Sequence, residues 1–242
     1  MAKKTLADPT EFGLELMSPD EIMVGETNAV VYGAPGSGKS TLAATAPSPL
    51  ILDFENGAAA SARIVQNPGL RILRVTEVQQ VRDAYSYLAS GKHEFKTVVL
   101  DPVGELYRMM LRSVVEQYTS RRQYDDLPSM ADWNKALSDM IKLITAFRAL
   151  PIHCVITAHA SIPEHEEDTV KPLVSGKQFG PFLEGSMDLL AYLHIEEDSS
   201  GQSVRRLITA PTPTIRAKNR GGKLPAVIED PNLSDIFDLM ES

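Results

Sequence analysis

Residues 29–45 are AVVYGAPGSGKSTLAAT, an apolar run followed by a glycine-rich loop and a segment compatible with a helix. The loop GAPGSGKS, residues 33–40, fits the pattern G-x-x-x-x-G-K-[ST] at every fixed position. Glycines in such a loop let backbone N–H groups converge on a phosphate, where a side chain would block the approach. This stretch therefore predicts a strand, a phosphate-binding loop and a helix, in that order.

The same loop carries the residues expected to bind a nucleoside triphosphate. Lys39 is expected to reach the β- and γ-phosphates, and the Ser40 hydroxyl is expected to ligate Mg²⁺. ATP with Mg²⁺ is therefore the predicted cofactor pair. The predicted nucleotide-binding residues are Gly33, Ala34, Pro35, Gly36, Ser37, Gly38, Lys39, Ser40 and Thr41.

Outward from the loop, short apolar runs alternate with helical patterns, which is typical of an α/β fold with a mainly parallel sheet flanked by helices. The expected parallel strands are residues 29–32, 50–52, 70–73, 97–100 and 152–157. Thr76 is expected to cap one helix, and an apolar stripe from Trp133 to Phe147 indicates another.

After residue 185 the pattern changes to closely spaced runs joined by polar turns. We expect these runs to form an antiparallel C-terminal extension of the same sheet. They are residues 189–195, 204–209 and 214–217.

Acidic residues stand at the ends of two of the expected parallel strands. Asp101 ends the run TVVLD, the form of a Walker B motif, and is the second predicted metal ligand; the alternative is a turn-forming Asp before Pro102. Glu55 follows the second strand and is a candidate base for the attacking water, with Glu105 as its rival. Asp53 is then expected to be structural, or to support the groups that contact the ligand without contacting it.

The fifth expected strand leads to His159. A polar group at this position can sense a γ-phosphate and relay its presence to the following loop. The alternative is a histidine that is merely hydrogen-bonded at a strand end.

Composition limits the classes of partner and compartment. The 242-residue chain has a net charge of -8, so any contact with nucleic acid must come from a local basic patch. Its one cysteine, Cys154, lies in an apolar run and fits a reducing cytoplasm. No apolar stretch approaches 18 residues and no signal peptide is found, so we expect a cytoplasmic protein without membrane contact.

These features together resemble the RecA-like ATPases, and most closely the short phage RecA-core ATPases associated with single-strand annealing recombination. The resemblance spans roughly residues 25–232 and implies a RecA-like P-loop NTPase core with ATPase activity. It implies that Glu55 is the catalytic base and that His159 is the γ-phosphate sensor. Four stretches carry it: GAPGSGKS (33–40), ILDFENG (51–57), TVVLD (97–101) and AKNRG (217–221).

Residues Lys218 and Arg220 resemble the K-x-R element of RecA-like ring helicases, in which two cations reach the γ-phosphate of the neighbouring subunit. Because Lys218 and Arg220 are two residues apart, their side chains would project from the same face if this segment is a strand. The alternative is a solvated basic edge. The resemblance implies a homo-oligomer, either a ring or a filament, with residues 1–26 as a possible oligomerisation arm and residues 27–242 as a single domain.

The resemblance also implies contact with single-stranded DNA through residues 119–131 and 160–181. Arg121, Arg122 and Tyr124 offer phosphate contacts and a stacking ring in the first segment. Lys177 offers a phosphate contact in the second, although acidic residues there argue against a strong phosphate track. A single-strand binding or annealing protein is a further expected partner, and the compartment would be the host cytoplasm if the protein is phage-encoded.

Two other functions fit a phosphate-binding loop. One is a small-molecule kinase, which would need an acceptor pocket and an arginine-rich lid; no arginine-rich helical pattern is found in the C-terminal half. The other is a nucleotide-gated adaptor that binds ATP without turning it over.

Overall fold

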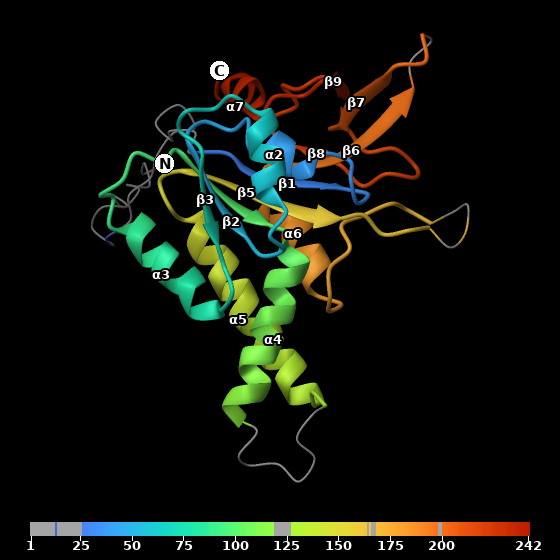
Figure 1. The fold of residues 1–242 in the computed structure, drawn as a ribbon. Coiled ribbons are helices and arrows are strands. Elements are labelled where there is room, and N and C mark those ends of the chain that lie inside the picture. The colour runs from blue at the N-terminus through green and yellow to red at the C-terminus, as the bar shows by residue number, and fades with distance from the viewer. Residues whose placement is uncertain (1–12, 14–25, 119–126, 164, 166–167, 198–199) are drawn as a thin grey trace, which may run out of the picture.

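The structure is a computed structural model, and it describes residues 13, 26–118, 127–163, 165, 168–197 and 200–242 (Figure 1). The strands are β1 (Asn28–Gly33), β2 (Pro49–Asp53), β3 (Arg71–Arg74), β4 (Thr97–Asp101), β5 (His153–His159), β6 (Leu189–Glu197), β7 (Ser203–Ile208), β8 (Lys218–Asn219) and β9 (Val227–Glu229). The helices are α1 (Lys39–Ala43), α2 (Ala58–Ile64), α3 (Val78–Ala89), α4 (Val103–Tyr118), α5 (Met130–Arg148), α6 (Phe179–Ser186) and α7 (Leu233–Glu241).

The strands form one mixed sheet in the order β3-β2-β4-β5-β1-β6-β7-β9, with β8 paired to β6. Strands β1 to β6 run parallel, whereas β7 and β8 are antiparallel to β6 and β9 is antiparallel to β7. The expected fold class is therefore confirmed: an α/β fold with a mainly parallel sheet flanked by helices and an antiparallel C-terminal extension. Because β1 lies between β5 and β6, the loop that follows it opens at the middle of the sheet edge.

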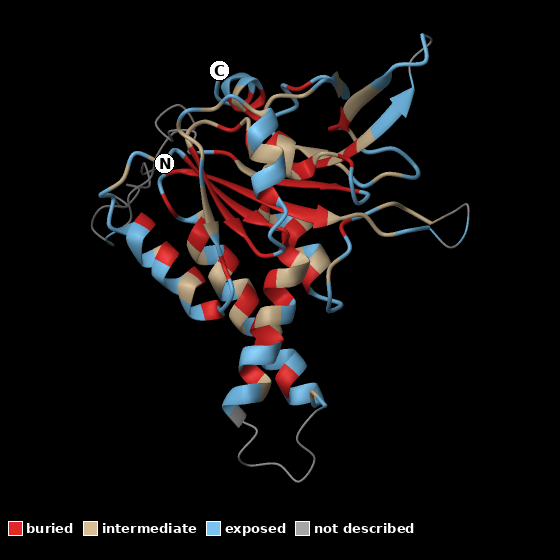
Figure 2. Cartoon of the chain, in the orientation of Figure 1, coloured by how far each residue is buried: buried red, intermediate tan, exposed pale blue. Residues whose placement is uncertain are grey.

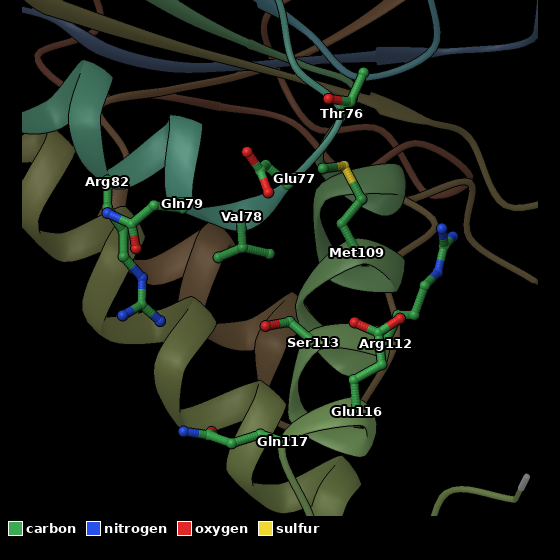
Figure 3. A pocket seen from close by; sticks show the side chains of 10 residues that line it. All are labelled: Thr76, Glu77, Val78, Gln79, Arg82, Met109, Arg112, Ser113, Glu116 and Gln117. Carbon is green, nitrogen blue, oxygen red and sulfur yellow. The ribbon is translucent and has the colours of Figure 1, made fainter. Parts of the chain in front are cut away.

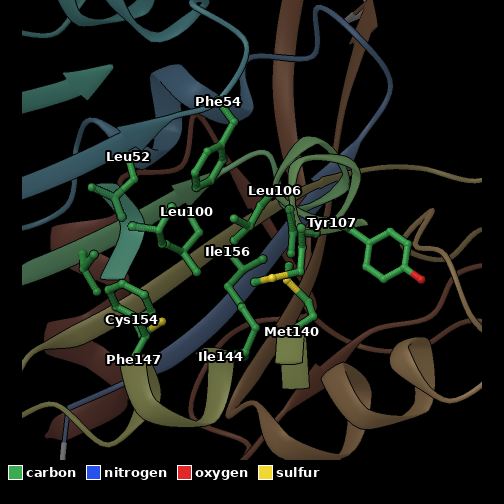
Figure 4. Close-up of a cluster of buried hydrophobic side chains, with 14 of the residues drawn as sticks. Leu52, Phe54, Leu100, Leu106, Tyr107, Met140, Ile144, Phe147, Cys154 and Ile156 are labelled. Atoms are coloured by element: carbon green, nitrogen blue, oxygen red, sulfur yellow. The ribbon is translucent and has the colours of Figure 1, made fainter. Parts of the chain in front are cut away.

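Helices cover both faces of the sheet, and the buried residues lie where helix and sheet meet (Figure 2). One face packs against α3, α4, α5 and α6, with Leu100, Ile144 and Phe147 fully buried there (Figure 4). The other face packs against α1, α2 and α7. Burial on both faces explains why the central strands are unbroken apolar runs rather than alternating ones.

The C-terminal extension differs from the expectation at its first strand. Strand β6, expected to be antiparallel, pairs with β1 in the parallel direction, with Ala29 opposite Leu189. The reason is the helix α6, which precedes β6 and returns the chain to the start of the sheet. Gly180, Pro181 and Gly185 weaken the helical pattern of that segment and hid the crossover from sequence analysis.

Two further expectations are wrong. Residues 214–217 do not form a strand: Ile215 makes only an isolated bridge with Val170, and the strand β8 begins at Lys218. The N-cap of α3 is Glu77 and not Thr76: the Glu77 backbone is extended, and its carbonyl accepts a hydrogen bond from the Gln80 N–H at 3.2 Å.

Candidate functional site

The phosphate-binding pattern forms the loop between β1 and α1. Gly36 and Gly38 have φ angles of 79° and 93°, a left-handed conformation that residues with a side chain rarely adopt. The Lys39 Nζ donates hydrogen bonds to the backbone oxygens of Gly33 and Ala34, at 3.1 and 2.8 Å. The lysine is therefore folded back over its own loop.

The Lys39 ammonium is mostly buried, and this burial lowers its pKa. The carboxylates of Asp101 and Glu55 oppose that shift, because each favours the charged ammonium. A polyanionic ligand would favour the charged form in the same way. The buried lysine is therefore suited to bind phosphate.

The Asp101 carboxylate lies at the end of β4, beside the end of β5. The Thr157 hydroxyl donates a hydrogen bond to the Asp101 Oδ1. Burial raises the pKa of Asp101, while hydrogen bonds from Ser40 and Thr157 lower it. Sequence analysis missed Thr157, whose role depends on β4 and β5 being neighbours. The signal available was its position two residues before His159, which places both side chains on the same side of the strand.

Glu55 and His159 meet across the groove, with 3.6 Å between the Glu55 Oε1 and the His159 Nε2. The loop carrying Glu55 is held by Asp53, whose carboxylate accepts hydrogen bonds from the backbone N–H groups of Glu55, Gly57 and Ala58 at 3.0 to 3.2 Å. Asp53 thus has the structural position expected of it.

A groove of about 300 Å³ brings these groups together. Its lining residues are Pro35, Gly36, Gly38, Lys39, Ser40, Thr41, Glu55, Ser61, Asp101, Pro102 and His159. The rival base Glu105 does not line it and forms an ion pair with Arg108 on α4. Gly33 and Ala34 contribute their carbonyls to Lys39, and Ser37 is buried within the loop.

A larger hollow, of about 600 Å³, lies between α3 and α4 (Figure 3). Glu77 and Arg82 line it from the α3 side, and Arg112 and Glu116 line it from α4. Within the part of the chain that the structure describes, none of the predicted site residues lines this hollow. We therefore place the candidate site in the smaller groove, where the predicted groups converge.

The two cations predicted to act in trans lie near the start of β6, at the end of the strands away from the phosphate loop. Lys218 Nζ donates to the carbonyls of Glu184 and Gly185, both at 3.0 Å, and Arg220 Nη1 donates to Asp188 Oδ1 at 2.7 Å. The strand β8 contains Lys218 but ends before Arg220. Burial and the neighbouring Arg220 lower the pKa of Lys218.

The predicted DNA contacts are only partly within the described chain. Arg121, Arg122 and Tyr124 lie outside the described residues, as does nearly all of the possible arm, residues 1–26. Lys177 is exposed in the turn before α6. In the second segment, Leu173 N–H donates to the His159 carbonyl at 2.7 Å, so this segment begins and returns at the groove.

A family model described as AAA domain matches residues 26–221 of the chain, which include every residue of the groove. A search of curated proteins finds no match. Among the described residues, no helix is both long and apolar enough to cross a membrane.

Proposed function

This chain belongs to the AAA domain family of P-loop ATPases, and from that premise we propose that it binds ATP with Mg²⁺ in the groove beside β1 and hydrolyses it. The observation that carries the proposal is the convergence of Lys39, Asp101, Glu55 and His159 on one groove at the phosphate loop. A phosphate loop alone accounts for binding, whereas hydrolysis also needs a metal-binding carboxylate and a group that orients water.

The residues present fit a magnesium ion. The Ser40 hydroxyl and the Asp101 carboxylate share a hydrogen bond and both line the groove, and oxygen ligands of this kind are the ones that Mg²⁺ prefers. A bound Mg²⁺ held by these oxygens would neutralise part of the negative charge of the triphosphate. Thr157 keeps the Asp101 carboxylate oriented towards this position.

In this proposal the protein's own side chains divide the work. Lys39 exchanges the carbonyls of Gly33 and Ala34 for phosphate oxygens. Glu55 orients a water molecule and accepts its proton. His159 has its Nε2 near Glu55 and a buried Nδ1 that has no hydrogen-bond partner among the described residues, so it can respond to a new charge in the groove.

The further proposal is that the protein acts as an oligomer on single-stranded DNA in phage recombination or annealing. It is supported by the resemblance to RecA-like ATPases and by two features of the described chain. Arg220 lies away from its own phosphate loop, as a cation acting in trans must, and the segment from Ala160 to Leu173 is hydrogen-bonded to His159 at its base.

The test is the rate of ATP hydrolysis with and without single-stranded DNA, measured for the unaltered protein and for Lys39→Ala. We expect turnover that DNA stimulates and that Lys39→Ala abolishes without loss of the fold, because the substitution removes the cation at the β- and γ-phosphates. Hydrolysis unchanged in a folded Lys39→Ala protein would refute the groove as the site. A rate of hydrolysis that does not change with single-stranded DNA would be consistent with the proposed ATPase activity and would refute the DNA proposal.

A further inference from the structure

A second cation lies against the phosphate loop from the side opposite the groove's catalytic groups. A Cβ atom built on Gly38 would be 3.3 Å from the Arg205 Cδ and 3.5 Å from its Nη1. The arginine stem and guanidinium therefore pack directly on the loop, and glycine at position 38 leaves room for them. Arg205 belongs to β7, far from the loop in sequence.

The position of Arg205 is set by the sheet. Arg205 pairs with Ile195 of β6, and its carbonyl accepts a hydrogen bond from the Asp230 N–H at 2.8 Å. Because side chains alternate along a strand, Arg205 shares a face with Leu207, which is fully buried in the core cluster formed with α1 and α7. This is the face on which the phosphate loop enters α1.

The neighbouring arginine provides a contrast. Arg206 points to the other face and is engaged by two carboxylates, those of Glu196 and Glu229. The Arg205 guanidinium has no ion pair or hydrogen bond within the described part of the chain. A guanidinium that packs on a phosphate loop without an anionic partner is placed to bind phosphate, for which its planar fork of donors is suited.

The strand order determines which part of a nucleotide it would meet. Glu55, Asp101 and His159 follow or end β2, β4 and β5, which lie on one side of β1, whereas Arg205 comes from the other side. If Glu55 orients the attacking water, the γ-phosphate faces the first side. The remaining phosphates of the same nucleotide then lie towards Arg205.

We propose that Arg205 is a nucleotide-binding residue supplied in cis, whose guanidinium binds the α- and β-phosphates of the nucleoside diphosphate part of the ligand. This inference rests on the proposed function, because it takes the groove to be the nucleotide site. It differs from the trans cations Lys218 and Arg220, which concern the γ-phosphate.

The test measures the dissociation constants of Mg-ADP and Mg-ATP by calorimetry, with Glu55→Gln as the background to prevent turnover. The variants are Arg205→Gln, which retains a stem to pack on Gly38, and Arg205→Lys, which retains the charge. The matched control is Arg206→Gln, one residue away on the opposite face. We expect Arg205→Gln to weaken the binding of ADP and of ATP by a similar factor, about tenfold or more. Arg205→Lys should weaken the binding of both nucleotides less, and Arg206→Gln should leave both dissociation constants unchanged.

Several results would overturn the proposal. The first is that Arg205→Gln leaves the affinities for ADP and ATP unchanged. The second is a loss of affinity for ATP but not for ADP. The third is a loss of affinity for ADP without a matching loss for inorganic tripolyphosphate, used as a competitor. The last two would place the arginine at the γ-phosphate and at the nucleoside, respectively. Failure of the parent Glu55→Gln protein to bind any nucleotide would instead refute the proposed function itself, so the two failures are distinguishable.

Discussion

At the scale of single residues, the choice between two glutamates decides how the groove would work. Glu55 lines the groove beside His159, whereas Glu105 lies on α4 in an ion pair with Arg108. We expect Glu55→Gln to keep ATP affinity within a few-fold and to cut turnover by about 10²-fold or more, because it removes a base and not a ligand. Turnover and affinity measured side by side provide the check.

Glu105→Gln is the matched control for that prediction, since it makes the same chemical change outside the groove. Its turnover should stay close to that of the unaltered protein. The assignment of the base to Glu55 is wrong if Glu105→Gln stops turnover and Glu55→Gln does not.

Thr157 is a positioning residue, because it acts through the Asp101 carboxylate. Thr157→Val removes the hydroxyl and leaves a buried carboxylate with one donor fewer, which costs about 1–3 kcal/mol of stability. We expect the Mg²⁺ concentration for half-maximal ATPase rate to rise, and Thr157→Ser to restore it. A change in stability alone would not move this concentration.

The control for Thr157 is Thr97→Val. The Thr97 hydroxyl is also buried, but it donates to the Pro47 carbonyl at the other end of β4, at 2.8 Å. This variant should lose stability without a change in Mg²⁺ requirement. An equal shift in both variants would mean that Thr157 affects the site only through the fold.

At the scale of helices and strands, the sequence predicted what is local and missed what depends on distant pairing. The end of each central strand could be read from an apolar run followed by polar residues, and Glu55, Asp101 and His159 line the groove at those strand ends. The roles assigned to them stay predictions. The hydrogen bond between Thr157 and Asp101 could not, because it requires β4 and β5 to be neighbours.

The C-terminal extension illustrates the same limit. A strand at residues 189–195 was predicted, but its direction depends on the crossover helix α6, which two glycines and a proline conceal. The three-residue strand β9 was not predicted, because its pairing with β7 comes from the register of the sheet and not from a local pattern.

The packing of α7 on the sheet predicts a dependence of stability on pH. His153 is buried, stacks on Phe237 of α7 with ring centroids 4.4 Å apart, and accepts a hydrogen bond from the Thr27 N–H through Nδ1 at 3.0 Å. Burial lowers the pKa of His153, and Lys96 acts in the same direction, against Glu26 and Asp238, which raise it. The neutral ring is thus the form that the fold favours.

The direction of this pH dependence follows from the protonation of His153 in the folded and the unfolded protein. Above about pH 6.5 the His153 ring is neutral in both the folded and the unfolded protein, so its contribution to stability is complete. As the pH falls below that value the unfolded chain binds the proton first, and unfolding becomes more favourable by at most about 1.4 kcal/mol per pH unit. The Glu241 Oε1 lies 3.5 Å from the His153 Nδ1, and burial raises the pKa of Glu241. The contribution of Glu241 to stability therefore has the opposite pH dependence and is lost as the pH rises.

The measurement is urea unfolding at pH 8.5, 7.5 and 5.5 for the unaltered protein and His153→Asn, whose amide oxygen can still accept from the Thr27 N–H. Between pH 7.5 and 5.5 we expect a smaller loss of unfolding free energy in the variant, and between pH 8.5 and 7.5 parallel behaviour. The same loss in both proteins would exclude His153 as its source.

At the scale of the whole molecule, the sheet separates Arg220 from its own phosphate loop. The Arg220 N–H donates to the Asp188 carbonyl at 2.8 Å, and the Asp188 carboxylate accepts from the Asn28 N–H, at the start of β1. The phosphate loop begins at Gly33, five residues further along that strand, or roughly 16 Å. The Arg220 side chain is too short to cover that distance, so within one chain it has no route to the γ-phosphate.

Redirecting Arg220 to a neighbouring subunit would cost little. The Arg220 side chain is 58% exposed, and the Asp188 side chain, which is 21% exposed, keeps its hydrogen bond from the Asn28 N–H when the arginine leaves. A fully exposed ion pair is worth about 0–1 kcal/mol. If Arg220 acts in trans, the site is complete only between two subunits. Specific ATPase activity should then rise with protein concentration over the range in which the chain assembles, which light scattering on the same samples can define.

Mixing variants tests this arrangement directly. Arg220→Ala should bind ATP without turnover, because its own Gly33 to Ser40 loop and Asp101 are intact, and Glu55→Gln should do the same for lack of a base. When the two variants are mixed, some interfaces combine an intact Glu55 with an intact Arg220, so part of the activity should return. A mixture of Glu55→Gln with Lys39→Ala is the control: both changes damage the same half of the interface, so no pairing is complete and activity should stay absent. If Arg220→Ala with Glu55→Gln is as inactive as this control, or if a monomer is fully active at every dilution, the site is complete within one chain and Arg220 has no part in the neighbour's reaction.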